Sequence, residues 1–272
     1  MSSLGRITHL YRFPFKSMQG EALQSVPVDE GGIDGDRTWA LRDLETDKIV
    51  SAKRPSLWRE LLNCQARGVG REVTVTLPDK SEWSVVDPKL ETALSELFGR
   101  PVKVELATQT QQGVYASDWP EIEGLSLAGS VDIPVNLAGQ GTSFVDVAAL
   151  HFITTASLAA LAELVPETGT DLRRFRPSLV IDTNTDPGFI ENEWEGRTLK
   201  LGEVQIEVGV PTPRCVMPTL AQGDLASLPE VLRTLASNNR VTSMLGTFAS
   251  LGSYASVNGA GVINVGDEVT FA

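Results

Sequence analysis

Hydrophobic and polar positions alternate in short runs along the first hundred residues, and turn residues separate the runs. Alternation with a period of two is typical of half-buried β-strands. It predicts strands at residues 7–15, 22–29, 38–43, 48–52, 72–77 and 82–87. Glycine-rich and proline-containing turns, such as GGIDGD and LPDK, divide these strands. The pattern therefore indicates a β-rich first domain.

One helix interrupts these strands, at about residues 87–99. Leu90 and Leu94 are spaced to lie on one buried face. Asp87 is expected to cap the start of the helix, and Gly99 to end it in a left-handed conformation.

Regular periodicity fades between residues 107 and 146, where Gly, Ser, Thr, Gln and Pro are frequent. We expect a linker or long surface loops in this segment, with a boundary near Ser117. This boundary gives a first domain of residues 1–117 and a second of residues 118–272. The loops of 108–140 are expected to surround the functional site and to set its specificity.

The second domain opens with a strand that runs directly into a helix, and Thr155 is expected to cap that helix. Another helix is predicted around residues 229–239, with Pro229 in its first turn. Strands are predicted at residues 178–183, 198–208, 253–258 and 261–272. Many strands with few helices predict an α+β fold that is mainly β, with barrel-like sheets in both domains.

Composition and charge narrow the class of protein. Hydrophobic residues make up 42% of the chain and charged residues 21%, which is typical of a packed globular protein. A net charge of -12 disfavours a nucleic-acid partner, because phosphate backbones are bound by clusters of Lys and Arg. No apolar run approaches the roughly 20 residues of a membrane helix, and the first residues lack a secretion signal. We therefore expect a cytoplasmic protein with no membrane partner.

The chain has only two cysteines, Cys64 and Cys215, which argues against a disulfide framework and predicts two free thiols. Its two histidines occur without an HExxH or CxxC motif, which disfavours a zinc site. Lys16 and Ser17 follow FPF where a phosphate-binding P-loop requires glycines, so the pair does not form such a loop.

Basic and small polar residues occur where predicted strands end or turn. Such a set suits an anionic ligand, because guanidinium groups bind phosphate bidentately and lysine binds it as a point charge. An arginine beside Cys215 would favour the thiolate, a soft metal ligand. Taken singly, each residue also has a structural interpretation, as a packed thiol or an ion-pair partner, and Cys64 keeps that interpretation. The set comprises Lys16, Ser17, Arg37, one of Lys53 and Arg54 (we select Lys53), Arg176 and Arg214.

The motifs KS, GDRxW, SAKR, FRPxxVI, RC, GxYxxV and GxIxVGDxV follow one another between Tyr11 and Phe271. In order and approximate spacing they resemble MOSC-domain proteins that carry an N-terminal β-barrel domain. This group includes the mitochondrial amidoxime-reducing component and its bacterial relatives. Thr212 departs from the pattern, because the amidoxime-reducing proteins carry another cysteine there.

The resemblance implies that Cys215 binds the molybdenum of a molybdenum cofactor (molybdopterin). It further implies an oxidoreductase that reduces N-hydroxylated small molecules, with electrons from a separate donor protein. One alternative is a cofactor carrier or sulfur-transfer protein, related to the C-terminal part of cofactor sulfurases. Another is a module that binds a different anion, with the cysteine incidental. By the same resemblance, the pterin and its phosphate are held by Lys16, Ser17, Arg37, Lys53, Asp146, Arg176, Arg214 and Tyr254.

Overall fold

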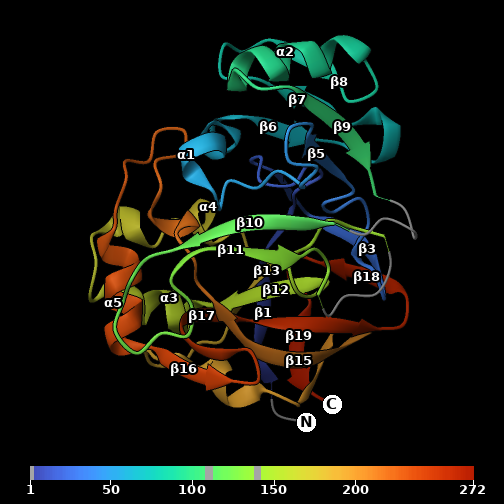
Figure 1. The fold of residues 1–272 in the computed structure, drawn as a ribbon. Helices are drawn as coiled ribbons and strands as arrows, with labels where there is room; N and C mark the ends of the chain where they lie inside the picture. Colours follow the sequence, from blue (N-terminus) through green and yellow to red (C-terminus); the bar gives the residue numbers. More distant parts are fainter. Residues whose placement is uncertain (1–2, 108–112, 138–141) are drawn as a thin grey trace.

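The computed structural model describes residues 3–107, 113–137 and 142–272 (Figure 1). Its centre is a closed barrel in which β12 pairs with both β13 and β17, with the order β12-β13-β1-β19-β14-β15-β17. The fold is mainly β with few helices, as the sequence predicts. The barrel strands are β1 (Ser3–Arg12), β12 (Leu150–Thr154), β13 (Leu179–Asp182), β14 (Thr198–Leu201), β15 (Val204–Pro213), β17 (Gly246–Asn258) and β19 (Glu268–Phe271).

A second set of short strands forms the N-terminal part, at the top of Figure 1. It has its own core, which includes Phe15, Trp39, Leu61, Val75 and Leu90. Strand β5 pairs with β9, and β7 lies between β6 and β8. The elements are β5 (Trp39–Asp43), α1 (Pro55–Trp58), β6 (Gln65–Arg67), β7 (Thr74–Thr76), β8 (Glu82–Ser84), α2 (Pro88–Phe98) and β9 (Val102–Leu106).

Strands from the beginning of the chain pair with strands from its end. β1 lies between β13 and β19, and β3 (Ser25–Asp29) lies between β4 (Gly32–Ile33) and β18 (Gly261–Asn264). β2 (Glu21–Leu23) pairs antiparallel with the end of β1. β1 is therefore a strand of the barrel, and β3 and β4 pack against the barrel core, while the division at residues 117 and 118 stays a prediction.

The sequence predicted a linker or long surface loops at residues 107–146. This prediction is wrong for the described part of the segment, which contains a β-hairpin. β10 (Val114–Trp119) pairs with β11 (Gly129–Pro134), and Ser117 lies within β10. Figure 1 shows the hairpin crossing in front of the barrel, below the N-terminal part. Tyr115, Ser117 and Trp119 are buried, so packing stabilises a strand that the polar composition conceals. Residues 108–112 and 138–141, also in the predicted loops, lie outside the described residues.

The predicted helices are present, but the residue that caps α3 differs from the predicted one. The Asp87 side chain caps α2 through Lys89 N at 2.9 Å, and Gly99 ends it with φ 61°. Thr154, and not Thr155, caps α3 (Thr155–Ala162), because Thr154 Oγ1 accepts from Ser157 N at 3.1 Å. The other helices are α4 (Leu172–Phe175), α5 (Glu230–Asn238) and the 3-10 helices Arg59–Asn63, Gly70–Glu72, Glu167–Gly169, Ile190–Trp194 and Met217–Thr219.

The strand predicted at residues 48–52 is also wrong. No strand forms there: Ile49 makes an isolated bridge with Arg42, and its N–H donates to Val114 O of β10 at 2.9 Å, so the alternation reflects a buried segment beside these strands. β16 (Arg240–Ser243), which was not predicted, extends the barrel sheet beside β17. Among the described residues, no helix has the length and apolar character needed to cross a membrane. The cytoplasmic location stays a prediction.

Candidate functional site

A cavity lies where residues of the N-terminal part meet the barrel. Its wall contains every residue selected from the sequence, whereas Arg54 lies elsewhere and donates from Nη1 to Ser130 Oγ at 3.0 Å. The structure thus brings the selected set together, although its role stays a prediction. The selected residues on the wall are Lys16, Ser17, Arg37, Lys53, Asp146, Arg176, Arg214, Cys215 and Tyr254.

Three of these residues have a left-handed backbone, which is uncommon for residues other than glycine. Ser17, Arg37 and Arg176 have φ values of 68°, 49° and 55°. Hydrogen bonds hold each in place: Ser17 Oγ accepts from Ala52 N at 3.0 Å. Arg37 N donates to a carbonyl at 2.7 Å, and Arg176 N donates to another at 2.8 Å. Such strained positions cluster at functional sites.

Asp146 balances the two lysines of the cavity. Lys16 Nζ lies 2.5 Å from Asp146 Oδ1 and also donates to Phe144 O at 2.8 Å. Lys53 Nζ lies 2.9 Å from Asp146 Oδ2 and 3.3 Å from the Tyr115 hydroxyl. Burial acts to raise the pKa of Asp146, but the two ammonium groups hold it well below its usual range. The carboxylate therefore stays charged and offsets part of the lysine charge.

The arginines leave an excess of positive charge. Arg37 pairs with Asp36, and the guanidinium groups of Arg37 and Arg176 lie 5.1 and 4.2 Å from the centre of the Phe13 ring. Arg176 is buried, yet its Nη1 and Nη2 have no hydrogen-bond partner. Burial, together with the charge of Arg37, lowers the pKa of Arg176 to about 9. A buried cation without a partner is costly, so the geometry favours a bound anion.

Arg214 is held rigidly beside Cys215. Its Nε donates to Leu251 O at 3.0 Å, its Nη1 donates to Phe175 O at 3.2 Å, and its Nη2 contacts His151 Nε2. Burial and the charge of Arg214 lower the pKa of His151 well below its usual value, so this ring is neutral and accepts the Arg214 hydrogen bond. No motif in the sequence assigns His151 to the site, so this contact was not predicted. A histidine in a strand of apolar neighbours was the available signal, since a buried polar group needs a partner.

Cys215 follows β15 and is 6% exposed. One side of it borders the cationic cavity, whereas Trp119 and Phe248 pack with it in an apolar cluster. Thr212, the departure from the family pattern, lines the same cavity, and its buried Oγ1 has no partner. Both cysteines are free, as expected. Cys64 is buried in the N-terminal core, where burial raises its pKa to about 12, in keeping with a structural role.

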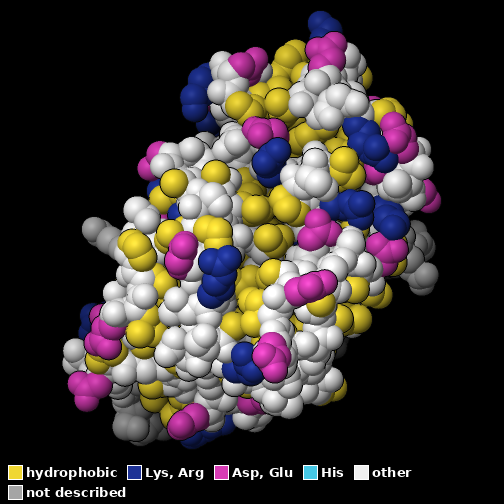
Figure 2. All heavy atoms as spheres, turned by 60° about the vertical axis from the view of Figure 1, so that its left-hand side comes forward, with side chains coloured by type: hydrophobic (Ala, Val, Ile, Leu, Met, Phe, Trp, Pro, Cys, Tyr) yellow, Lys and Arg dark blue, Asp and Glu magenta, His cyan; other side chains and the backbone are white. Residues whose placement is uncertain are grey.

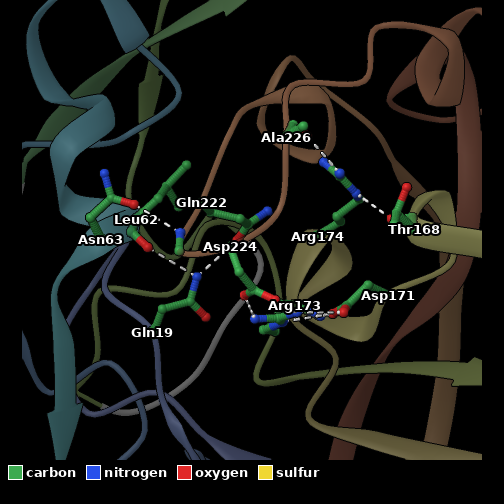
Figure 3. A network of polar contacts seen from close by, with 11 residues as sticks. Gln19, Leu62, Asn63, Thr168, Asp171, Arg173, Arg174, Gln222, Asp224 and Ala226 are labelled. Carbon is green, nitrogen blue, oxygen red and sulfur yellow. Dashed lines mark hydrogen bonds and ion pairs between the residues drawn. The ribbon is translucent and has the colours of Figure 1, made fainter.

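The loop that follows Cys215 is fixed by Arg174, which sequence reasoning also missed. Arg174 lines the cavity, but its guanidinium donates only to backbone carbonyls. Its Nε reaches Thr168 O at 2.7 Å, and its Nη1 reaches Pro218 O at 3.0 Å and Leu220 O at 3.2 Å. Its Nη2 donates to Ala226 O at 2.7 Å, and Figure 3 shows the side chain extended between these segments. Arg174 is therefore a structural cation that is not available to a ligand.

The same loop is also tied to the N-terminal part. Gln19 Nε2 donates to Gln222 Oε1 at 2.8 Å, and Gly223 N donates to Asn63 Oδ1 at 2.8 Å (Figure 3). Arg173 adds an exposed pair with Asp224. The segment carrying Cys215 is thus held from both parts of the molecule.

The donor set fits the cofactor that the family resemblance implies. The described residues contain no group of three or more His, Cys, Asp or Glu side chains that could hold a metal ion. A metal at Cys215 must therefore bring most of its ligands with it, as molybdenum does when a pterin dithiolene carries it. The unpartnered guanidinium of Arg176 suits the phosphate of such a cofactor.

Comparisons with known proteins identify two family domains in the chain and proteins similar to it. The MOSC domain family matches residues 140–270, and the MOSC N-terminal beta barrel domain family matches residues 4–118. The chain is 27% identical over 263 residues to molybdenum cofactor sulfurase of Oryza sativa subsp. japonica, covering 84% of this chain and only 30% of the sulfurase. It is 27% identical over 294 residues to mitochondrial amidoxime-reducing component 1 of Danio rerio. This match covers 99% of this chain and 85% of the Danio rerio protein. Among solved structures it is similar to the YUAD protein from Bacillus subtilis, with a TM-score of 0.42 and 12% identity. The match covers 97% of this chain and 93% of the YUAD chain.

Proposed function

Because the chain is a MOSC-domain protein with the MOSC N-terminal beta barrel domain, we propose that it is a molybdenum-cofactor-binding oxidoreductase. The proposed reaction removes oxygen from an N-hydroxylated small molecule. The N–O bond breaks, two electrons and two protons are consumed, and the amine or amidine and water are released. The electrons come from a separate donor protein. The observation that carries the proposal is the unpartnered Arg176 guanidinium in the same cavity as the Cys215 thiol.

The residues of the chain have distinct tasks in this proposal. Cys215 binds the metal, and when bound the cofactor supplies two-electron oxygen-atom transfer. Arg176 and Arg37 hold the phosphate, while Lys16 and Ser17 position the pterin. Burial raises the pKa of Tyr254, so its hydroxyl stays protonated and is a hydrogen-bond donor to the bound group.

Metal analysis tests the proposal. Protein purified from a host that makes the cofactor is expected to hold about one molybdenum per chain, and Cys215→Ala to hold almost none. Cys64→Ala, which removes the other buried thiol, is the matched control and should keep its molybdenum. Wild-type protein that takes up no molybdenum on reconstitution would rule the proposal out. If Cys215→Ala kept full affinity for the cofactor while Arg176→Ala lost it, the protein would instead be an anion-binding module.

A second candidate is a cofactor carrier or sulfur-transfer protein. It is favoured by the likeness to the molybdenum cofactor sulfurase of Oryza sativa, of which the matched region makes up 30%. The two candidates differ in turnover. An oxidoreductase converts benzamidoxime to benzamidine when a chemical reductant is supplied, and this conversion disappears in Cys215→Ala. A carrier holds molybdenum without converting benzamidoxime.

A further inference from the structure

A second cavity lies beside the one that Cys215 lines. Its volume is about 430 Å³, within the roughly 300–1,000 Å³ typical of sites for small molecules. Residues of β5, α1 and β10 contribute to its wall, together with the segment between β5 and α1. Ser51 borders both cavities, Lys53 lines the cavity of Cys215, and Arg54 lines the second one. The two cavities therefore meet at the segment of residues 51–54.

The charged residues that line this second cavity have ion-pair partners, except for Arg54. Arg100 donates from Nε to Asp43 Oδ1 at 2.9 Å and from Nη2 to Asp43 Oδ2 at 3.0 Å. Lys48 Nζ lies 2.8 and 2.7 Å from the two carboxylate oxygens of Asp132. In contrast, Arg54 has no Asp or Glu partner within the described part of the chain. Its charge is therefore left unbalanced in the wall of the cavity.

Composition does not explain this unbalanced charge. Acidic side chains outnumber basic ones in the chain, 35 to 23. Figure 2 shows Lys and Arg side chains lying among Asp and Glu side chains over the face that it presents. The lack of a described acidic partner at Arg54 is therefore not due to a shortage of carboxylates.

The guanidinium group of Arg54 has an unused edge. Its Nη1 donates to Ser130 Oγ at 3.0 Å, whereas its Nε is buried without a hydrogen-bond partner. No described group accepts from its Nη2 either. Nε and Nη2 form the edge that binds two oxygens at once, as the same edge of Arg100 does with Asp43. Because an unpaired buried donor is costly, the arrangement favours a ligand that supplies two acceptor oxygens.

We propose that this cavity is a second anion-binding site, which takes the carboxylate or phosphate group of a small molecule. Two oxygens of that group accept from Arg54 Nε and Nη2. The site goes beyond the proposed function, because it requires neither Cys215 nor the molybdenum cofactor. Since the two cavities meet at Ser51, the bound anion lies next to the cofactor cavity and leaves it free for the cofactor.

Titration with inorganic phosphate, followed by NMR at constant ionic strength, tests the site. The resonance of the Arg54 Nε–H group is expected to shift and to saturate as phosphate binds. The same shift should occur in Arg176→Met, which removes the unpartnered guanidinium of the cofactor cavity and so separates the two sites.

Variants of Arg54 test the two-oxygen contact, with the backbone amides of residues 51–57 as the readout. Arg54→Met should raise the dissociation constant for phosphate about tenfold or more, because both donors are lost. Arg54→Lys keeps the charge but cannot bind two oxygens side by side, so it should raise the constant about fivefold. Arg59→Met, the same change as Arg54→Met at an exposed position near the end of α1, is the matched control and should bind phosphate like wild type.

Two results would overturn the second site. One is an Arg54 resonance that does not move with phosphate, or that moves in wild type and no longer moves in Arg176→Met. The other is a dissociation constant that is equal in wild type and Arg54→Lys, the variant that also serves if Arg54→Met does not fold. Molybdenum content does not enter either measurement. Failure here therefore leaves the proposed function intact, and protein that takes up no molybdenum leaves this site intact.

Discussion

Lys16 Nζ lies 2.5 Å from Asp146 Oδ1, although 130 positions separate the two residues in the chain. Lys16 follows β1, and Asp146 lies in the segment that leads into β12. With Lys53 on the other carboxylate oxygen, Asp146 ties the N-terminal part to the barrel at the wall of the cavity. This carboxylate therefore contributes both to the charge of the site and to the stability of the fold.

Replacing Asp146 with Asn is expected to lower the free energy of unfolding at pH 7 by about 3 kcal/mol, because two buried ammonium groups lose their partner. The folded-state pKa of Asp146 lies well below its usual value, so its contribution is complete above the ordinary carboxyl pKa of about 3.9. It is lost as the pH falls below that value. Urea unfolding measures the free energy of unfolding of wild type and Asp146→Asn. The difference between the two should be constant from pH 7 to about 4.5 and should shrink below pH 4. A difference that shrinks between pH 7 and 5 would contradict the assignment.

Arg176 is expected to reduce stability when no ligand is bound. Arg176→Met removes a buried cation with two unpartnered nitrogens, so the free energy of unfolding of cofactor-free protein should rise by about 1–2 kcal/mol. The variant should also lose its molybdenum. Arg214→Met is the contrasting change, because it leaves the carbonyls of Leu251 and Phe175 without a donor and should destabilise by about 3 kcal/mol. Urea unfolding of cofactor-free proteins measures both, and a loss of stability in Arg176→Met would show that the guanidinium has a structural role.

Replacing Arg174 should lower the stability of the protein far more than replacing its neighbour Arg173. Arg174→Lys cannot reproduce donors to Thr168, Pro218, Leu220 and Ala226, so we expect a loss of about 2–4 kcal/mol in the free energy of unfolding. Amide hydrogen exchange in residues 217–226 should become faster. Arg173→Lys, whose ion pairs are at the surface, should leave exchange in this loop unchanged. Equal effects of the two changes would refute this role for Arg174.

The contribution of Glu191 to stability is expected to change with pH in the opposite direction to that of Asp146. It is fully buried and accepts from Thr154 Oγ1 at 2.7 Å, Ser157 Oγ at 2.6 Å and Gly252 N at 3.1 Å. Burial raises its pKa above the ordinary 4.5, despite these donors. The folded state therefore binds the proton more tightly, and the associated stability is present below pH 4.5 and lost as the pH rises.

The difference in unfolding free energy between wild type and Glu191→Gln should therefore fall as the pH rises from about 4.5 toward 7. Glu193→Gln, the same change at an exposed position of the same 3-10 helix, is the control and should leave the free energy of unfolding nearly unchanged. Urea titrations at several pH values measure both. A difference that grows with pH would show that the pKa of Glu191 is lowered in the folded protein.

Local signals in the sequence predicted local structure well. Asp87 and Gly99 bound a helix because capping depends on a few neighbouring residues. Two consecutive threonines made the start of α3 ambiguous by one position, and only the Thr154 hydrogen bond decides it. The β10–β11 hairpin was missed because its buried side chains include Ser117, which no hydrophobic pattern identifies.

The candidate site was predictable as a set because short motifs mark its members. The contacts between them were not, since they join distant segments: Lys16 with Asp146, and Arg214 with His151. Trp119 carries no motif, and its proximity to Cys215 depends on how the hairpin crosses the barrel. Similarly, Arg174 stands one residue before Phe175 in a basic run, and only the structure separates its role from that of Arg176.

The place of β1 between β13 and β19 also bears on how the protein is made. During synthesis β1 emerges long before β19, so its two neighbours in the barrel do not yet exist. The N-terminal core, formed mainly by residues 39–102, can pack in the meantime because its contacts are local. The barrel closes only after β19 has left the ribosome. The cavity between Lys16, Asp146 and Cys215 is therefore complete only after the barrel has closed, and binding of the proposed cofactor would follow translation.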